Sequence, residues 1–186
     1  AGIKGPIVTI VMDGYGIAKI EAGSAIAAAN KPTLDRLFAN YPNISLRAHG
    51  TAVGMPSDED MGNSEVGHNA IGAGQVYSQG ASLVADAIAT GAIWQGQAWQ
   101  QIVAAAKTGA NGKPGVIHFI GLFSDGNVHS HIDHLKAMVL RAKEEGVKAV
   151  RIHALIDGRD VPETSALLYV EPFEAFLTDV STGGFD

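Results

Sequence analysis

Three apolar runs, each followed by an acid and a glycine, constrain the fold of this chain more than any other feature. The runs span residues 6–12, 116–123 and 150–156, and the pairs Asp13-Gly14, Asp125-Gly126 and Asp157-Gly158 follow them. Continuous apolar runs are typical of strands that are buried on both faces of a parallel sheet. Helical patterns separate the runs, so the sequence predicts an α/β fold with parallel strands.

Helices are expected where apolar side chains recur every three or four residues. The predicted helices cover residues 24–40, 81–106 as two helices broken at Gly91, 128–146 and 165–177, and a short strand is predicted at 44–48. Residues 50–80 are instead rich in Gly, Ser, Asn and acids. A loop of that length inside a globular chain is usually functional or a linker, and we expect one or both here.

Composition excludes several classes of protein. Hydrophobic residues make up 46% of the 186 residues and charged residues 17%, which supports a core and excludes a wholly disordered chain. The net charge of −6 argues against a nucleic-acid partner. The chain has no cysteine, so disulfides and thiolate chemistry are excluded. The early apolar run at 7–12 is too short to span a bilayer, and no targeting segment is recognised. We therefore expect a soluble, cytoplasmic protein without a membrane partner.

The acids at the strand ends are candidates for chemistry, because ligands of open parallel sheets bind beyond the carboxyl ends of the strands. A carboxylate there can hold a hard cation or contact a reacting hydroxyl. For Asp125 and Asp157, a simple Asp-Gly turn explains the pair equally well. Asp13 follows a fully apolar run, which favours a functional role for this acid.

Ser64 lies in a glycine-flanked polar run at 60–69 and has two interpretations. Most loop serines before a helix are N-caps, and the run taken alone favours that role. The same position suits a nucleophile, since helix-start amides and a divalent cation would stabilise an alkoxide and a phosphoserine. A metal ion would also lower the pKa of the hydroxyl.

Two further groups of polar residues follow the later strands. The first is a histidine-rich turn with His129, His131 and His134. A His-x-His pair is compatible with a metal site, with solvated first-turn residues, or with donors to an anion at a helix start. The second group is Arg159 with Asp160. Its arginine suits two-pronged binding of a carboxylate or phosphate, and the alternative is a surface ion pair of little consequence.

Four segments occur in the order that is found in a known enzyme family. They are Asp13-Gly14-Tyr15-Gly16, Asn63-Ser64-Glu65-Val66-Gly67-His68, Ser124-Asp125-Gly126-Asn127-Val128-His129 and Asp157-Gly158-Arg159-Asp160. Together they resemble the cofactor-independent phosphoglycerate mutases of the alkaline phosphatase superfamily, from about residue 7 to residue 186. The resemblance implies an isomerase of glycolysis and gluconeogenesis. Such an enzyme interconverts 2- and 3-phosphoglycerate through a phosphorylated serine and needs no 2,3-bisphosphoglycerate.

The resemblance also implies roles for five residues of this chain. Asp13 and Ser64 would be ligands of a site with two divalent metal ions, usually Mn²⁺, with Mg²⁺ or Co²⁺ as alternatives. Ser64 would be the nucleophile. His129, Arg159 and Asp160 would bind the substrate, with Arg159 holding its carboxylate or phosphate and Asp160 acting as acid and base on the glycerate hydroxyl. A metal role for the histidine turn becomes less favoured.

The implied architecture has three layers around a parallel sheet. Residues 1–78 would form the N-terminal part of an alkaline-phosphatase-like domain, and residues 79–186 the first half of an inserted α/β transferase domain. The other metal ligands of the family lie beyond the equivalent of residue 186. We therefore expect this chain to be the N-terminal part of a monomeric enzyme, inactive by itself. Ser24 and Gln75 depart from the family pattern.

Two other functions stay open at this point. The first is another metal-dependent phosphatase or phosphomutase of the same superfamily, which would share Asp13 and Ser64 but not necessarily the Arg159-Asp160 pair. The second is a non-catalytic binding module, which the Ala-rich helices also permit. A mutase differs from a phosphatase in releasing little free phosphate.

Overall fold

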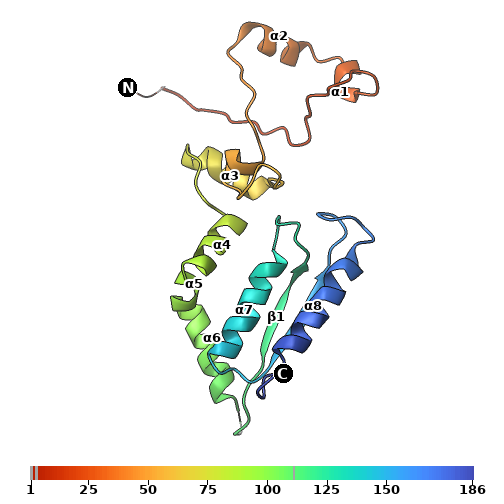
Figure 1. Cartoon of the computed structure of the whole chain (residues 1–186). Helices are drawn as coiled ribbons and strands as arrows, with labels where there is room; N and C mark the ends of the chain where they lie inside the picture. Colours follow the sequence, from red (N-terminus) through yellow and green to blue (C-terminus); the bar gives the residue numbers. More distant parts are fainter. Residues whose placement is uncertain (1, 3, 111) are drawn as a thin grey trace. The chain divides into compact units, whose positions relative to one another are not determined.

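The computed structural model describes residues 2, 4–110 and 112–186, which belong to two compact units. The first unit is Ala1–Leu46 and the second is Arg47–Asp186. Figure 1 shows the two units, with the strands and the longest helices in the second. None of the helices in the described part of the chain is long and apolar enough to cross a membrane.

The first unit contains two helices, α1 (Ala25–Ala28) and α2 (Pro32–Asn40). Ser24 caps α1, because its hydroxyl accepts a hydrogen bond from the amide of Ala27 at 3.2 Å. Pro32 begins α2, where its missing N–H costs no helical hydrogen bond. The helical prediction for residues 24–40 is confirmed, with an interruption at residues 29–31 that the pattern does not indicate.

The strands predicted at residues 6–12 and 44–48 are wrong for this structure. Both segments lack regular structure and are unpaired, and Ile7, Val8 and Ile10 are 75%, 79% and 77% exposed. β-branched side chains favour an extended backbone, yet a strand also needs a neighbour that takes its N–H and C=O groups. No described residue pairs with either segment, so the sequence pattern by itself does not produce a strand there.

The second unit begins with the short 3₁₀ helix η1 (Gly50–Val53) and helix α3 (Ser64–Ala73). The interpretation of 50–80 as one long loop is therefore wrong. Small residues hide the helical pattern of α3, whose one buried side chain is Val66. That side chain packs with Val53 and Met55 in a small core of its own.

Gln79 joins α3 to the segment that follows it. This buried side chain donates hydrogen bonds to the carbonyls of Val53 and Val66, at 3.0 and 2.9 Å, and accepts one from Asn69 at 3.0 Å. Three polar partners compensate the loss of water around a buried amide. They also hold the start of the next helix against α3.

Three helices follow in one Ala-rich stretch: α4 (Ala81–Ala89), α5 (Ala92–Gln95) and α6 (Gln97–Thr108). The break predicted at Gly91 is confirmed, since this residue has the left-handed φ of 75° that glycine adopts without strain. A second break at Gly96 divides the stretch again.

The sheet has two parallel strands, β1 (Ile117–Phe123) and β2 (Val150–Ile156), as the sequence predicts. Their register pairs Ile117 with Val150 and Phe123 with Ile156. Helix α7 (Ile132–Glu144) connects the strands and α8 (Ala166–Val180) follows the second. The α/β class with a parallel sheet is confirmed.

The main core lies on one face of this sheet. Alternate strand residues, Ile117 and Phe119 in β1 and Val150 and Ile152 in β2, pack with apolar side chains of α6, α7 and α8. The other face is open, with Ile120 69% and Leu155 53% exposed. A helix layer on that second face, as in the expected three-layer architecture, stays a prediction.

We expect Val139→Ala to destabilise the chain by about 1–3 kcal/mol, because it removes two methyl groups from a filled site. Val139 is fully buried in α7 and belongs to the main core. Urea unfolding followed by circular dichroism measures the change. Leu167→Ala in α8, whose side chain is 64% exposed, is the control and should change the unfolding free energy by less than about 0.5 kcal/mol. Equal effects from the two substitutions would contradict this position of the core.

Candidate functional site

The carboxyl ends of β1 and β2 bring two sequence motifs together. Since the strands are parallel and Phe123 pairs with Ile156, the residues that follow them, Ser124 and Asp157, lie at the same edge of the sheet. The loop 124–131 leads from β1 to α7, and the loop 157–165 leads from β2 to α8. This edge is where parallel sheets bind their ligands.

Asp157 is an internal anchor of its own loop. One carboxylate oxygen, Oδ1, accepts hydrogen bonds from the amides of Gly158, Arg159 and Asp160 at 2.7, 3.0 and 3.2 Å. The other, Oδ2, accepts the hydroxyl of Ser124 at 2.6 Å. Of the two interpretations of this acid, the structure supports the turn.

The environment of Asp157 favours its charged form. Burial raises the pKa of its carboxyl, but the hydrogen bonds from Ser124 and from the amides of Arg159, Asp160 and Gly158 outweigh burial and lower this pKa to about 2. Hydrogen bonds that favour a carboxylate have this effect in general. The anchor is therefore ionised wherever the pH lies well above that value.

Asp125 has a partner that the sequence does not indicate. The hydroxyl of Tyr169 in α8 donates a hydrogen bond to its Oδ1 at 2.6 Å. This bond, then burial, raises the pKa of Tyr169 to about 12. In the sequence Tyr169 is one residue of an amphipathic helix, so only the tertiary structure brings it to this loop.

The loop 124–131, which we call the histidine loop, is held to the end of β1 by its backbone and by Ser130. The Ser130 hydroxyl donates to the carbonyl of Leu122 at 2.5 Å, and the amide of Ile132 donates to the carbonyl of Ser124 at 2.9 Å. His131 caps α7 by accepting the amide of Asp133 at 3.1 Å. His129, which precedes these anchors, is exposed.

His134 stands one helical turn after the cap, and its ring centroid lies 5.4 Å from that of His131. Burial, and then the charge on His131, lower the pKa of His134. No cluster of three or more metal-ligating side chains occurs among the residues that the structure describes. The metal interpretation of these histidines thus receives no support from their geometry.

Of the two interpretations of Ser64, the N-cap is wrong, because Asn63 has that role. The Asn63 side chain accepts the amide of Val66 at 2.9 Å, and Ser64 is the first residue of α3. The Ser64 hydroxyl is exposed and lies 3.2 Å from Nδ1 of His68. That nitrogen also lies 2.7 Å from the Ser64 carbonyl oxygen, which can only accept a hydrogen bond. Nδ1 therefore carries a proton in this bond and is not a base for the hydroxyl.

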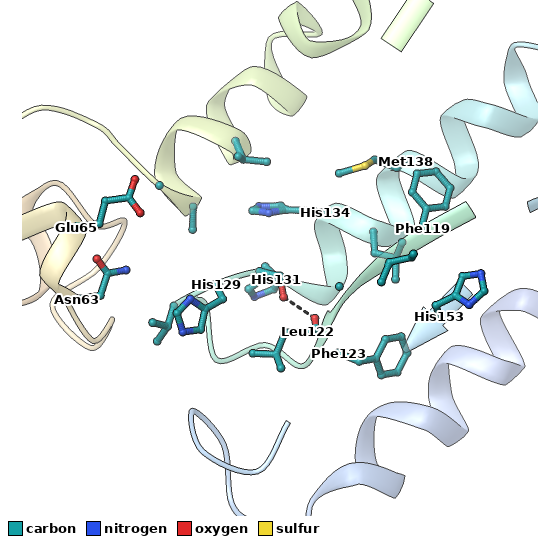
Figure 2. Close-up of a pocket in the computed structure, with 18 of the residues that line it drawn as sticks. Asn63, Glu65, Phe119, Leu122, Phe123, His129, His131, His134, Met138 and His153 are labelled. Atoms are coloured by element: carbon teal, nitrogen blue, oxygen red, sulfur yellow. Dashed lines mark hydrogen bonds between the residues drawn. The ribbon is translucent and has the colours of Figure 1, made fainter. Parts of the chain in front are cut away.

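Ser64 and His129 line the same cavity, which has a volume of about 680 Å³. Its walls come from the loop and first turn of α3, from α4, from β1 and β2, from the histidine loop and from α7. In Figure 2, Asn63 and Glu65 lie on one side of this cavity and His129, His131 and His134 on another. Two motifs that are distant in the sequence thus face one space.

Arg159 and Asp160 are not among the residues that line this cavity. They lie in the loop after β2, which approaches the histidine loop closely: a Cβ added to Gly126 would lie 2.7 Å from Cβ of Asp160. Only glycine allows this approach. No ion pair joins Arg159 to Asp160 among the described residues, so the structure does not show the surface ion pair that the sequence left open.

A hydrogen bond also joins the loop before α3 to the histidine loop. Nδ2 of Asn127 donates to Oδ1 of Asp60 at 2.6 Å. Burial raises the pKa of Asp60, but hydrogen bonds from Asn127 and Ser57 outweigh burial and lower it. Asn127 has a φ of 61°, a left-handed conformation that asparagine tolerates better than most residues. The sequence does not indicate this pair.

Asp13 belongs to the first unit and is exposed, between segments without regular structure. Its pairing with Ser64 at one metal ion stays a prediction. The same holds for the roles expected of His129, Arg159 and Asp160, and for a domain boundary at residue 78.

Comparison with known proteins identifies consistent similarities. The family described as BPG-independent PGAM N-terminus matches residues 84–185. A "Probable 2,3-bisphosphoglycerate-independent phosphoglycerate mutase" of Leptospira interrogans is 50% identical over 97% of this chain and 32% of that protein. The 2,3-bisphosphoglycerate-independent phosphoglycerate mutases of Clostridium novyi and Zea mays are 43% and 42% identical, again over 97% of this chain and over 34% and 32% of theirs.

Among solved structures, a crystal structure of Leishmania mexicana phosphoglycerate mutase at low cobalt concentration is similar, with a TM-score of 0.73 and 44% identity. The similarity covers 87% of this chain and 29% of that one. The chain spans about a third of the length of the curated relatives that it matches.

We expect Asn127→Gly to raise the pKa of Asp60, because it removes one hydrogen-bond donor to that carboxylate while keeping a residue that accepts a left-handed φ. An NMR titration of the side-chain carboxyls measures the shift. Asp58 is the internal control. Hydrogen bonds from Thr51 and Arg47 lower its pKa to about 2, and this pKa should not change in the variant. An unchanged pKa of Asp60 would contradict the hydrogen bond that joins the loop before α3 to the histidine loop.

Proposed function

Because the chain belongs to the BPG-independent PGAM N-terminus family, we propose that it is the N-terminal part of a 2,3-bisphosphoglycerate-independent phosphoglycerate mutase. In this proposal the complete protein interconverts 2- and 3-phosphoglycerate in the glycolysis and gluconeogenesis of the cytoplasm. The observation that carries the proposal is the shared cavity of Ser64 and His129. It supports a phosphate that moves between a serine and a bound glycerate.

Ser64 is the proposed nucleophile. Its hydroxyl opens onto the cavity at the first residue of α3, where free amides and the helix dipole favour a phosphate. The backbone cap is supplied by Asn63, so the hydroxyl is not needed for the start of the helix. His68 donates its Nδ1 proton to a carbonyl and therefore does not activate the serine in this arrangement.

His129, Arg159 and Asp160 are the proposed substrate contacts. His129 donates to the phosphate or carboxylate of the glycerate in the cavity, and Arg159 supplies a two-pronged donor for the other anionic group. Asp160 exchanges a proton with the glycerate hydroxyl. The close approach of the Asp160 loop to Gly126 supports placing all three on the substrate side.

Two divalent ions, Mn²⁺ with Mg²⁺ or Co²⁺ as alternatives, complete the proposal. Asp13 and Ser64 are oxygen donors of the type that such hard cations prefer. Two donors are too few for a full coordination shell, and the described residues hold no cluster of three ligands. We propose that ligands outside residues 1–186 complete the site. When bound, the ions would lower the pKa of the serine hydroxyl and neutralise phosphate charge.

The proposed partner is a small molecule, phosphoglycerate, and neither nucleic acid nor membrane. The net charge of −6 disfavours long polyanions, whereas local cationic groups suffice for one small anion. We further propose that the complete enzyme is a monomer. A phosphatase or another phosphomutase of the same superfamily would not need a side chain that binds the carboxylate of the substrate. The accessible Arg159 therefore favours the mutase.

Ser64→Ala in the complete protein should reduce mutase turnover by at least about 10³-fold, because no side chain remains to accept the phosphoryl group. A coupled assay with 3-phosphoglycerate measures turnover, and intact mass detects the phosphoenzyme. Ser181→Ala, at an exposed serine after α8, is the control and should leave both unchanged. Retained turnover in the Ser64 variant would remove this residue from the role, and release of most substrate phosphate by the wild type would favour a phosphatase.

A chelator should abolish turnover of the complete protein, and added Mn²⁺ should restore it while circular dichroism stays constant. The chain of 186 residues by itself should bind Mn²⁺ weakly and show no turnover, which calorimetry and the same assay measure. Turnover that resists the chelator would contradict the metal site. Substrate binding that is independent of Mn²⁺, in a complete protein without turnover, would favour a binding module.

A further inference from the structure

The loop that carries Arg159 and Asp160 has its backbone held by one carboxylate. Three successive amides, those of Gly158, Arg159 and Asp160, point at Oδ1 of Asp157. Three donors to one oxygen define the direction of each peptide plane in the loop. The directions in which the side chains of Arg159 and Asp160 leave the backbone are therefore set by this carboxylate.

The carboxylate is itself held by the first loop. Ser124, only 1% exposed, donates its hydroxyl proton to Oδ2 and accepts the amide of Gly126 at 3.2 Å. Gly126 in turn lies so close to Asp160 that an added Cβ would be 2.7 Å from Cβ of Asp160. One network of hydrogen bonds therefore spans the two loops and ends at the residues that would contact the substrate.

The charge of Asp157 is balanced without a cation. Its partners are three amides and a hydroxyl, and the ion pairs of the described residues do not include it. The anchor thus binds the main chain of Arg159 and leaves its guanidinium exposed. A cationic side chain without an internal carboxylate partner is available to an anionic ligand.

We propose that Asp157, supported by Ser124, is a positioning residue that holds Arg159 and Asp160 in the orientation needed to bind the glycerate. This inference rests on the proposed function, because it requires that those two side chains contact the substrate. Asp157 would not contact the substrate. It would act by holding the backbone of the loop from which Arg159 and Asp160 extend.

Two substitutions in the complete protein separate geometry from charge. Asp157→Ala removes all four hydrogen bonds, whereas Asp157→Asn keeps one oxygen for the amides and offers an amide group to Ser124. Asp179→Ala, at an exposed position in α8, is the matched control. Arg159→Ala is the reference for a lost substrate contact.

Two reactions are measured for each variant. In the proposed function, mutase kcat and KM with 3-phosphoglycerate depend on both Ser64 and the loop that carries Arg159 and Asp160. We expect hydrolysis of p-nitrophenyl phosphate by the complete protein to need Ser64 but no residue that binds a substrate carboxylate, so it would report general damage to the site. Thermal unfolding shows whether each variant is folded.

We expect Asp157→Ala to lower mutase kcat/KM by at least about 100-fold with a raised KM, and to change p-nitrophenyl phosphate hydrolysis by less than about twofold. Asp157→Asn should lose less than about tenfold in mutase kcat/KM, and the Asp179 control nothing. If Asp157→Ala does not fold, Ser124→Ala is the second variant. It should raise KM for 3-phosphoglycerate at least about threefold with unchanged hydrolysis.

Mutase kcat/KM of Asp157→Ala within about threefold of wild type would overturn the inference, and so would equal losses in both reactions. If Arg159→Ala is impaired and the Asp157 variants are not, the positioning role fails while the proposed function stands. If Arg159→Ala retains full mutase activity, the substrate clamp itself is wrong and the inference falls with it.

Discussion

The parallel pairing of β1 and β2 is the constraint on which the site depends. In the observed register Phe123 pairs with Ile156, so the next residues, Ser124 and Asp157, meet across the end of the sheet. A shift of one strand by one residue would separate this pair and turn the core-facing side chains of that strand to the other face. Burial of alternate residues such as Ile117 and Val150 on the helix-covered face holds the register, so the packing of the core also places the two loops.

The proposed functional residues share one arrangement. A neighbouring polar side chain accepts the hydrogen bonds of the backbone amides, and the functional side chain stays accessible. Asn63 caps α3, which leaves the hydroxyl of Ser64 exposed to the cavity. Asp157 binds the amides around Arg159, which leaves its guanidinium exposed. A polar group that already bonds the backbone in a turn or a cap is less able to bind a ligand as well. Separate residues for the two roles therefore keep the functional side chain free for the ligand.

The sequence predicts local structure well where a segment finds its partners within the described chain. The two strands of the sheet and the break at Gly91 are such cases, because periodicity and glycine conformation are local properties. The run at 6–12 has an equally strong strand pattern and forms no strand, since pairing requires a neighbour. Helix α3 is the opposite case: its small residues carry little apolar pattern, and hydrogen bonds of Asn63 and Gln79 with the backbone of Val66 stabilise it.

The amino-acid sequence by itself determined which chemical groups are present and in which order the family motifs occur, because these are properties of the covalent chain. It also pointed to Ser64, His129, Arg159 and Asp160 individually. Only the tertiary structure decided that Ser64 and His129 share a cavity and that Ser124 donates a hydrogen bond to Asp157. The partners in such contacts are far apart in sequence, as Asp60 and Asn127 are, and local patterns carry no information about them. They meet because the strands pair in one register and the core closes on one face of the sheet.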